Sequence, residues 1–249
     1  MLKLTIYTAA SGHYIDYLPL WGYCAKKAYP KSEVSYDTFL DPIVPHYAAC
    51  FRLLTEIHDT EYVYINDADM MILPEDQTLF DFHTKQMEED DLCYSNSPRT
   101  KEPEGQHRLT GLHFCNQEWY SKTREARVKY LHMLDAGEIG NHKFDDEKML
   151  MQVAKKSGLE IPRPRPLLPR HHGIHIGTIR AYNYKRHTRN TRDQQLRMRI
   201  SQKQAHQWIS YYDDPEFEGI VKHVSKRNRV IKDELEKLYS FCMRHKKDG

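Results

Sequence analysis

The sequence predicts an α/β protein with a mixed, largely parallel sheet flanked by helices, followed by a helical C-terminal extension. First, β-prone and helix-prone segments alternate from residue 2 to residue 65, which is typical of βαβ units with parallel strands. Second, Asp67 and Asp69 directly follow the third of these strands, at the sheet edge where α/β proteins bind ligands. Third, apolar residues recur at helical spacing from about Gln194 onward.

The first of these units begins with an alternating, β-prone run from Leu2 to Thr8. The small residues from Ala9 to Gly12 predict a turn whose backbone a ligand can approach closely. Asp16 is a suitable N-cap for the helix that follows and that ends before Pro30, and Pro19 is tolerated in its first turn.

Further strands and helices follow from the same two periodicities. Runs rich in β-branched and aromatic residues predict strands at 33–39, 62–65, 91–95 and 109–115. Apolar residues three and four positions apart predict helices at 47–57 and 119–134. In the last predicted helix, the expected core residues are Ile231, Leu235, Leu238, Phe241 and Cys242.

The polar segment 140–147 leads into another predicted helix, and Asp145 or Asp146 is well placed to be its N-cap. Four prolines between Ile161 and Arg170 predict an extended connector after that helix. We therefore expect a core domain of residues 1–180, with residues 181–249 as a basic, mainly helical extension that packs on the same domain.

The run from Tyr62 to Pro74 carries two carboxylates inside an otherwise apolar segment. Asp67 and Asp69 are two residues apart, so at an extended strand end their side chains point to the same side and one divalent cation can bridge them. Burying these carboxylates is costly unless a cation or hydrogen-bond donors compensate their charge. Carboxylate oxygens suit Mg²⁺ or Mn²⁺. We favour such a site over a solvated turn.

Composition excludes several classes of protein. A chain of 249 residues with 39% hydrophobic residues can bury a sizeable core. The five cysteines are widely spaced and form no C-x-x-C pair, which argues against a disulfide framework and a zinc site. The N-terminal residues lack the apolar run of a signal peptide, and no later run has the length of a membrane span. We expect a reducing, cytoplasmic location and no transmembrane segment.

The formal charge of +2 is nearly balanced, but one segment is strongly basic. From Arg163 to Lys203 there are eleven lysines and arginines and a single acidic residue, Asp193. Such a segment is either a solvated face or a site for an anionic partner. The anionic partners that we consider are a diphosphate, an acidic acceptor and a nucleic acid.

Taken in order, several features resemble one known family. They are a strand ending at Thr8, Arg52 on a helix, the segment from Tyr64 to Asp69, Gly111 ahead of Trp119, the pair Asp146 and Glu147 at a helix start, and a late cluster of histidine and glycine. This order resembles nucleotide-sugar glycosyltransferases of the GT-A fold, above all the glycogenin and lipopolysaccharide galactosyltransferase family. The likeness covers about Lys3 to Arg180.

The resemblance implies a donor site built from the first strands, the segment from Tyr64 to Asp69, and the late cluster of histidine and glycine. The donor-binding residues that it implies are Thr8, Ala9, Tyr14, Arg52, Asn66, Asp67, Gly177 and Arg180. Among them, Thr8 and Ala9 would line the nucleoside pocket, and Tyr14 would stack on the base unless it only packs in the first helix. Arg180 stands where the family has a lysine, three residues after the glycine.

The family also implies Mn²⁺ or Mg²⁺ bound by Asp67, Asp69 and a histidine. In the family that histidine precedes the glycine by three positions. Here His175 precedes Gly177 by two positions and His172 precedes it by five. We favour His175 as the ligand, with His172 as the alternative; a third interpretation is that His171, His172 and His175 are all surface groups of a basic loop.

Three acidic residues are candidates for the chemistry beside the transferred sugar: Asp145, Asp146 and Glu147. The family has an Asp–Gln pair where this chain has Asp146 and Glu147, so here a carboxylate replaces the glutamine near the anomeric carbon. A second departure lies at 109–111, where the family often has an asparagine, a small residue and a glycine. The donor sugar therefore need not be glucose or galactose.

These features predict a metal-dependent glycosyltransferase that moves a sugar from a nucleoside diphosphate sugar, a UDP-sugar by the resemblance, to a hydroxyl of a glycan or another acceptor. The family implies retention of configuration, with Asp146 or Glu147 as nucleophile or with front-face attack; inversion would use the same carboxylates as general base. One alternative is a nucleic-acid-binding protein that uses residues 163–203. Another is a metal-dependent nucleotidyltransferase or phosphodiesterase. Neither alternative explains the whole arrangement, so we expect no nucleic acid partner.

Overall fold

The computed structural model describes the chain except for residues 1–2, 100–106, 165–172, 178, 180–199 and 248–249. The chain divides into two compact units that alternate along the sequence. The first unit contains Met1–Gly12, Lys31–Asp67 and Gln77–Leu167; the second contains His13–Pro30, Ala68–Asp76 and Leu168–Gly249. The boundary at residue 180 that the sequence suggested stays a prediction.

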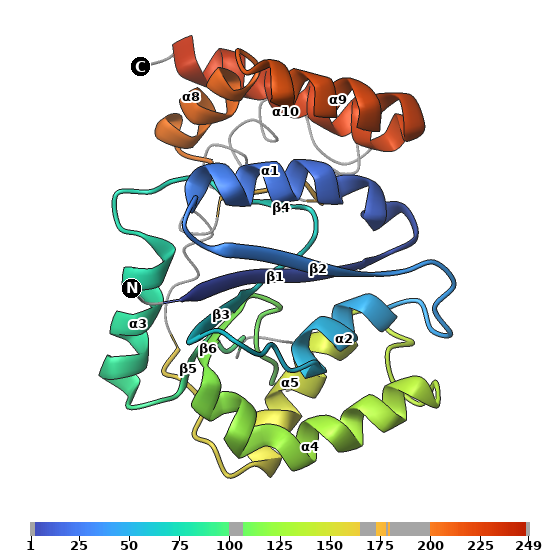
Figure 1. The fold of residues 1–249 in the computed structure, drawn as a ribbon, viewed down its shortest axis with the longest axis vertical. Helices are drawn as coiled ribbons and strands as arrows, with labels where there is room; N and C mark the ends of the chain where they lie inside the picture. The colour runs from blue at the N-terminus through green and yellow to red at the C-terminus, as the bar shows by residue number, and fades with distance from the viewer. Residues whose placement is uncertain (1–2, 100–106, 165–172, 178, 180–199, 248–249) are drawn as a thin grey trace. The chain divides into compact units, whose positions relative to one another are not determined.

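The first unit is built around a five-stranded sheet with the order β2-β1-β3-β6-β5 (Figure 1). Its strands are β1 (Leu4–Ser11), β2 (Glu33–Phe39), β3 (Tyr62–Ile65), β5 (Tyr94–Ser95) and β6 (His113–Asn116). β1 pairs in parallel with β2 and β3, whereas β6 runs antiparallel to β3 and β5. This mixed, largely parallel sheet flanked by helices confirms the predicted fold class.

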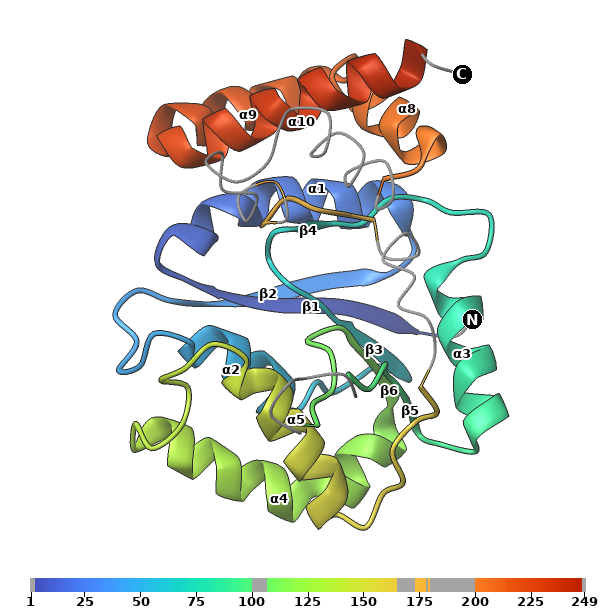
Figure 2. The ribbon, with the colours of Figure 1, turned by 180° about the vertical axis from the view of Figure 1, so that it is seen from behind.

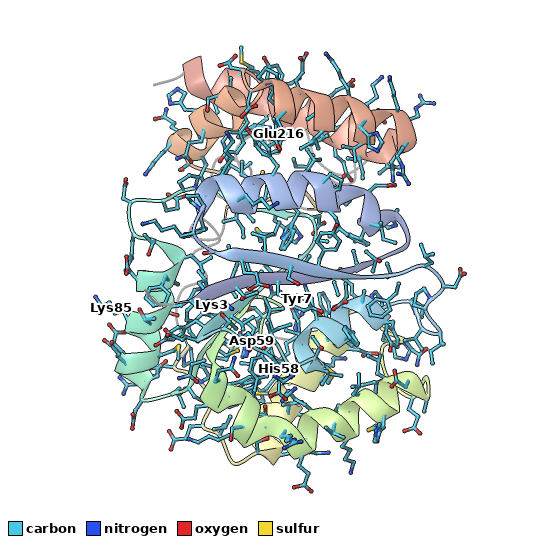
Figure 3. The ribbon with its side chains drawn as sticks, in the orientation of Figure 1. Lys3, Tyr7, His58, Asp59, Lys85 and Glu216 are labelled. Atoms are coloured by element: carbon cyan, nitrogen blue, oxygen red, sulfur yellow. The ribbon has the colours of Figure 1, made fainter. Side chains whose placement is uncertain are left out.

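One face of this sheet is covered by three helices that also pack against one another (Figure 1). These helices are α2 (Tyr47–Leu54), α4 (Gln117–Asp135) and α5 (Asp145–Lys156). Val63 and Ile65 of β3 and Cys115 of β6 point to this face, and all three are buried in its core. Tyr7 of β1 belongs to the same core and lies beside α2 (Figure 3).

The alternate residues of the same strands point to the other face, because successive side chains of a strand alternate. There Tyr62, Tyr64 and Phe114 meet α3 (Leu79–Asp90). The ring of Phe114 stacks on that of His83, with centroids 4.9 Å apart. An aromatic layer therefore fastens α3 to the centre of the sheet.

Two sequence signals behave differently from the prediction in this unit. The run from Ala9 to Ser11 continues β1 instead of turning, because it pairs with Asp37–Phe39 of β2, and the chain turns only at Gly12 with φ +54°. The expected N-cap at Asp145 or Asp146 is wrong. The N-cap of α5 is Phe144 in the left-handed region, and Asp145 accepts a hydrogen bond from the His142 N–H in the preceding turn.

The second unit is mainly helical (Figure 2). Its elements are a 3-10 segment η1 (Gly12–Tyr17), α1 (Leu18–Ala28), α8 (Gln202–Tyr211), α9 (Pro215–Arg227), α10 (Arg229–Lys247) and the short pair β4 (Met70–Met71) and β7 (Ile174–His175). α8 and α9 pack against α10, and α1 packs against α9. The predicted amphipathic helices of the C-terminal part are thus present, with Ile231, Leu235 and Leu238 buried.

Buried polar pairs hold α1 to the C-terminal helices. The Tyr23 hydroxyl donates to Asp214 over 2.7 Å, and the Tyr17 hydroxyl donates to the buried Glu234. Asp16 does not cap α1, whose N-cap is Tyr17; Asp16 instead accepts a hydrogen bond from the side chain of Asn228 at 3.1 Å. Its local sequence position suited a cap, but the tertiary contact takes its oxygen.

The five cysteine thiols are free and buried. Among the residues that the structure describes, no helix is both long enough and apolar enough to cross a membrane.

We expect Phe114→Ala to lower the free energy of unfolding of this protein by about 3–5 kcal/mol, because it leaves a cavity between β6 and α3. Urea unfolding followed by circular dichroism measures the change. Val128→Ala on α4, where the side chain is exposed, should change the same free energy by less than about 0.5 kcal/mol. Equal effects of the two substitutions would contradict the aromatic layer as a stabilising contact.

Candidate active site

Arg52, in the last turn of α2, is the centre of an acidic cluster in the first unit. The side chain is almost fully buried, and its Nη2 lies 2.6 Å from Oδ1 of Asp67 and 3.4 Å from Oδ2 of Asp146. Its Nε donates to the carbonyl of Ala49 in the same helix, over 3.3 Å. One guanidinium therefore joins Asp67, which follows β3, to Asp146 at the start of α5. The sequence had pointed to these two regions separately.

The segment before β6 lies against this cluster. A Cβ added to Gly111 would lie 2.8 Å from Nη2 of Arg52, 3.4 Å from Oδ2 of Asp146 and 3.8 Å from Oδ1 of Asp67. Contacts below about 3.0 Å are essentially absent for real side chains, so any other residue here would displace the end of the buried Arg52 side chain. Gly111 thus lets the backbone approach the charged groups.

Asn96, which was not among the residues predicted from the sequence, fixes the segment from Thr110 to Leu112. Its side-chain amide donates to the carbonyls of Thr110 and Leu112, each over 3.0 Å. Its Oδ1 accepts hydrogen bonds from the Thr110 N–H and hydroxyl, each at 2.9 Å. The only local signal is an asparagine directly after a β-prone run, which is also common in ordinary turns.

Asp146 and Glu147 start α5 side by side but point to different partners, since neighbouring helical residues are about 100° apart around the axis. Asp146 faces Arg52, whereas the Glu147 carboxylate pairs with Arg108 and lies 3.5 Å from Nη2 of Arg99. Asp145 is turned toward the preceding loop. Of the three candidate acids, the structure brings Asp146 to the Arg52 cluster and links Glu147 to two arginines that the sequence analysis had not singled out.

The two carboxyls are held at raised pKa values. Burial raises the pKa of Asp146, and the Asp67 charge adds to this, whereas Arg52 opposes it. Burial also raises the pKa of Glu147 to about 7; Arg99 and Arg108 oppose the shift, and Asp146 adds to it. Burying a carboxylate disfavours its charged form, which is the dominant effect at both positions.

The predicted nucleoside-binding residues lie in both units. In the first, the buried Thr8 hydroxyl donates to the carbonyl of Asn66 over 2.8 Å, and the Asn66 N–H donates to the carbonyl of Tyr7 over 3.2 Å. These bonds fix the ends of β1 and β3 at the aspartate segment, and Ala9 is buried on β1. In the second unit, Tyr14 contacts the ring of Tyr17, with centroids 6.0 Å apart. Their role in donor binding stays a prediction.

Asp69 and His175 meet in the second unit because β4 and β7 pair antiparallel, with Met70 opposite His175. The Ile176 N–H donates to the Asp69 carbonyl over 2.9 Å, which extends this pairing. The imidazole Nε2 of His175 lies 3.0 Å from Oδ1 of Asp69, whose side chain is buried. The structure therefore brings together two of the predicted metal-ligating residues, which are 106 residues apart in the sequence.

Two glycines make this pairing possible. Gly173 has φ +99°, and an added Cβ would collide with the Met71 carbonyl, 2.0 Å away. An added Cβ at Gly177 would lie 2.4 Å from Oδ2 of Asp69 and 3.1 Å from Nε2 of His175. A side chain at position 177 would therefore crowd both the Asp69 carboxylate and the His175 imidazole.

These side chains suit a hard divalent cation. Asp69 and His175, with Asp67 two residues earlier in the chain, are a group that could hold a metal ion. Two carboxylates and an imidazole are a donor set that Mn²⁺ accepts readily and Mg²⁺ accepts through the oxygens.

Much of the basic segment lies outside the described residues, including His172, Arg180 and the arginines from 186 to 199. At its two ends, Arg163 pairs with Asp90 at 3.5 Å and Lys203 pairs with Asp76 at 2.5 Å.

The chain was compared with protein families, curated proteins and solved structures. No family model matches the chain, and no curated protein matches it. It is similar to the crystal structure of the galactosyltransferase LgtC in complex with donor and acceptor sugar analogs, with 14% identity, 80% of this chain and 83% of that chain covered, and a TM-score of 0.40. It is also similar to an active-site mutant of LgtC, with 14% identity, coverage of 80% and 82%, and a TM-score of 0.39. Both TM-scores are low, so the function proposed below rests on the residues of the site.

The raised pKa of Glu147 predicts a pH dependence of stability. The folded protein keeps the Glu147 proton up to about pH 7, whereas the ordinary pKa of this group is 4.5. Between these values the unfolded chain binds fewer protons, so the free energy of unfolding falls as the pH rises from about 4.5 to about 7, at most by about 1.4 kcal/mol per pH unit.

Glu147→Gln removes this contribution. Urea unfolding at several pH values between 4.5 and 7.5 should therefore show wild type losing stability relative to the variant as the pH rises. The exposed Glu118→Gln serves as control and should show no such trend. A difference between wild type and Glu147→Gln that does not depend on pH would contradict the raised pKa.

Proposed function

We propose that this protein is a metal-dependent glycosyltransferase that transfers a sugar from a nucleoside diphosphate sugar, a UDP-sugar in the first instance, to a hydroxyl of a glycan or another acceptor. The observation that carries the proposal is the buried Arg52 between Asp67 and Asp146. It ties a carboxylate beside a candidate cation site to a second carboxylate of raised pKa at a helix start. Glycosyl transfer needs a place for the diphosphate, and a carboxylate beside the sugar can serve as nucleophile or general base.

The proposed cation ligands are Asp67, Asp69 and His175. A bound Mn²⁺ or Mg²⁺ supplies positive charge that stabilises the departing diphosphate. The chain contributes Asp69, directly before β4, and His175 of the paired β7, and the glycine at 177 places no side chain against them. A buried carboxylate beside an imidazole is costly by itself, so a cation at this place would compensate the Asp69 charge.

Asp146 is the residue that we assign to the sugar. It is fixed by Arg52 at the first turn of α5, and burial in a site of low polarity makes its carboxyl sensitive to charge that develops beside it. In a retaining reaction this carboxylate stabilises the positive charge of the sugar or attacks it directly; in an inverting one it takes the proton of the acceptor hydroxyl. The close backbone approach at Gly111 would let the sugar hydroxyls contact main-chain groups.

We expect Asp69→Ala to abolish Mn²⁺-dependent binding of UDP while the protein stays folded, because the cation loses a ligand. Isothermal titration calorimetry with MnCl₂ and UDP measures the binding. Asp76→Ala is the matched control, since Asp76 is an exposed aspartate seven residues after Asp69. UDP binding that persists in EDTA would rule out the proposed cation site.

We expect Asp146→Asn to keep UDP affinity close to that of wild type and to lower the turnover of donor hydrolysis by about 10³-fold, since this contact acts mainly in the transition state. A panel of UDP-sugars with Mn²⁺, assayed for release of UDP, first identifies the donor. Asp81→Asn, at the exposed start of α3, is the control. Normal turnover of Asp146→Asn would remove the residue from the chemistry.

A further inference from the structure

The Glu147 carboxylate is held on both of its oxygens. Arg108 donates from Nη1 to Oε2, and Nη2 of Arg99 lies 3.5 Å from Oε1. The two arginines stand opposite each other in an antiparallel bridge, in which the Arg99 N–H donates to the Arg108 carbonyl over 2.8 Å. Glu147 thus receives two guanidinium groups from one pair of facing backbone segments.

Arg108 is fixed in turn by its surroundings. Its side chain is almost fully buried, and the guanidinium lies over the ring of Phe144, 3.7 Å from the centroid. Phe144 is the N-cap of α5, so Arg108 contacts this helix start both through Phe144 and through Glu147. The Leu109 N–H also donates to the Glu147 carbonyl over 3.3 Å. The side chain of Glu147 therefore binds Arg108, and its backbone carbonyl binds the next residue, Leu109.

The fastened segment leads directly to the Arg52 cluster. Gly111, two residues after Leu109, lies against Arg52 and Asp146: a Cβ added to it would lie 2.8 Å from Nη2 of Arg52 and 3.4 Å from Oδ2 of Asp146. Asn96 holds the intervening Thr110 on both its N–H and its hydroxyl. The distance between Asp146 and the backbone at Gly111 is consequently set by contacts from both sides, one from Asn96 and one from Glu147 with Arg108.

A nucleophile or general base needs a carboxylate oxygen that can reach the reacting atom. In Glu147 one oxygen accepts a hydrogen bond from a buried guanidinium, and the other faces a second guanidinium. Such pairing lowers the electron density available on both oxygens. Asp146 has a longer contact with its arginine: its Oδ2 lies 3.4 Å from Nη2 of Arg52, and the same nitrogen lies 2.6 Å from Oδ1 of Asp67.

We propose that Glu147 is a positioning residue, which acts through Arg108 to hold residues 108–111 against Asp146, and that Asp146 alone of the two is the catalytic carboxylate. This rests on the transferase activity proposed above. Arg108 then also has a role in that reaction. By binding Glu147 and Phe144, it keeps residues 108–111 at a fixed place relative to the start of α5, and so beside the sugar. Arg99, more exposed, neutralises the other Glu147 oxygen.

The test compares two substitutions at one position. Glu147→Gln keeps an oxygen that can accept from Arg108, whereas Glu147→Ala removes it. For a positioning residue, the turnover of donor hydrolysis by Glu147→Gln should stay within about tenfold of wild type, and that of Glu147→Ala should fall by about 100-fold, as misplacement of a reacting group costs. For a nucleophile or base, both variants would lose about 10³-fold or more, and that result would overturn the proposal.

A second arm addresses Arg108. Arg108→Ala should lower turnover about as much as Glu147→Ala, and the double alanine variant should be little worse than either, because the two residues act through one contact. Additive losses would contradict this coupling. The Kd of UDP with Mn²⁺ should stay unchanged in all these variants, so that the loss appears in kcat. Loss of thermal stability with unchanged kcat would show a merely structural contact.

The exposed pair Glu118 and Lys122 on α4 provides the control, since Glu118→Gln removes an ion pair of the same type far along the chain. If wild type hydrolyses no UDP-sugar, the proposed function fails. Hydrogen exchange then tests separately whether the Glu147 side chain, through Arg108, holds residues 108 and 109. The Leu109 amide should exchange faster in Glu147→Ala than in Glu147→Gln. Equal exchange in these two variants would overturn the positioning role without reference to any reaction.

Discussion

The buried Arg52 guanidinium is the charge around which the first unit is arranged. A cation removed from water must be paired and hydrogen-bonded, and Asp67, Asp146 and the Ala49 carbonyl together meet this requirement. The consequence extends to the backbone, since Gly111 has no side chain where the guanidinium lies. Electrostatic compensation thus brings three parts of the chain together. They are Asp67 after β3, Asp146 at the start of α5, and Gly111 before β6.

Much of the fold could be predicted from the sequence because it depends on local periodicity. The strands at 33–39 and 62–65 have the predicted bounds, and the helices of the C-terminal part were expected from their apolar spacing. Prediction failed where long-range partners override local signals. The predicted strand 109–115 begins only at His113, because Asn96 takes the backbone groups of Thr110 and the carbonyl of Leu112 that a strand would pair. The predicted helix 47–57 ends at Leu54.

The candidate site divides in the same way. Asp67, Asp69 and Arg52 could be found because two carboxylates in an apolar run are unusual and because an arginine of an amphipathic helix stood in a recognisable order. The sequence does not reveal Asn96, Arg99 and Arg108 as site residues. Their partners lie elsewhere in the chain, and a lone arginine or asparagine has no periodicity that indicates burial. The choice of Glu147 as a second reacting acid had the same origin: its partners are visible only in three dimensions.

The alternation of the two units along the chain constrains how this protein can change in evolution. The second unit needs α1, the segment Ala68–Asp76 and the C-terminal helices, which come from three separate stretches of sequence. Tyr17, the N-cap of α1, and Tyr23 within α1 lose their hydrogen-bond partners Glu234 and Asp214 if the gene is cut before Asp214. Recombination therefore cannot exchange the C-terminal helices as an independent cassette: a new C-terminal part must fit an α1 surface encoded near the start of the gene, and the two must vary together.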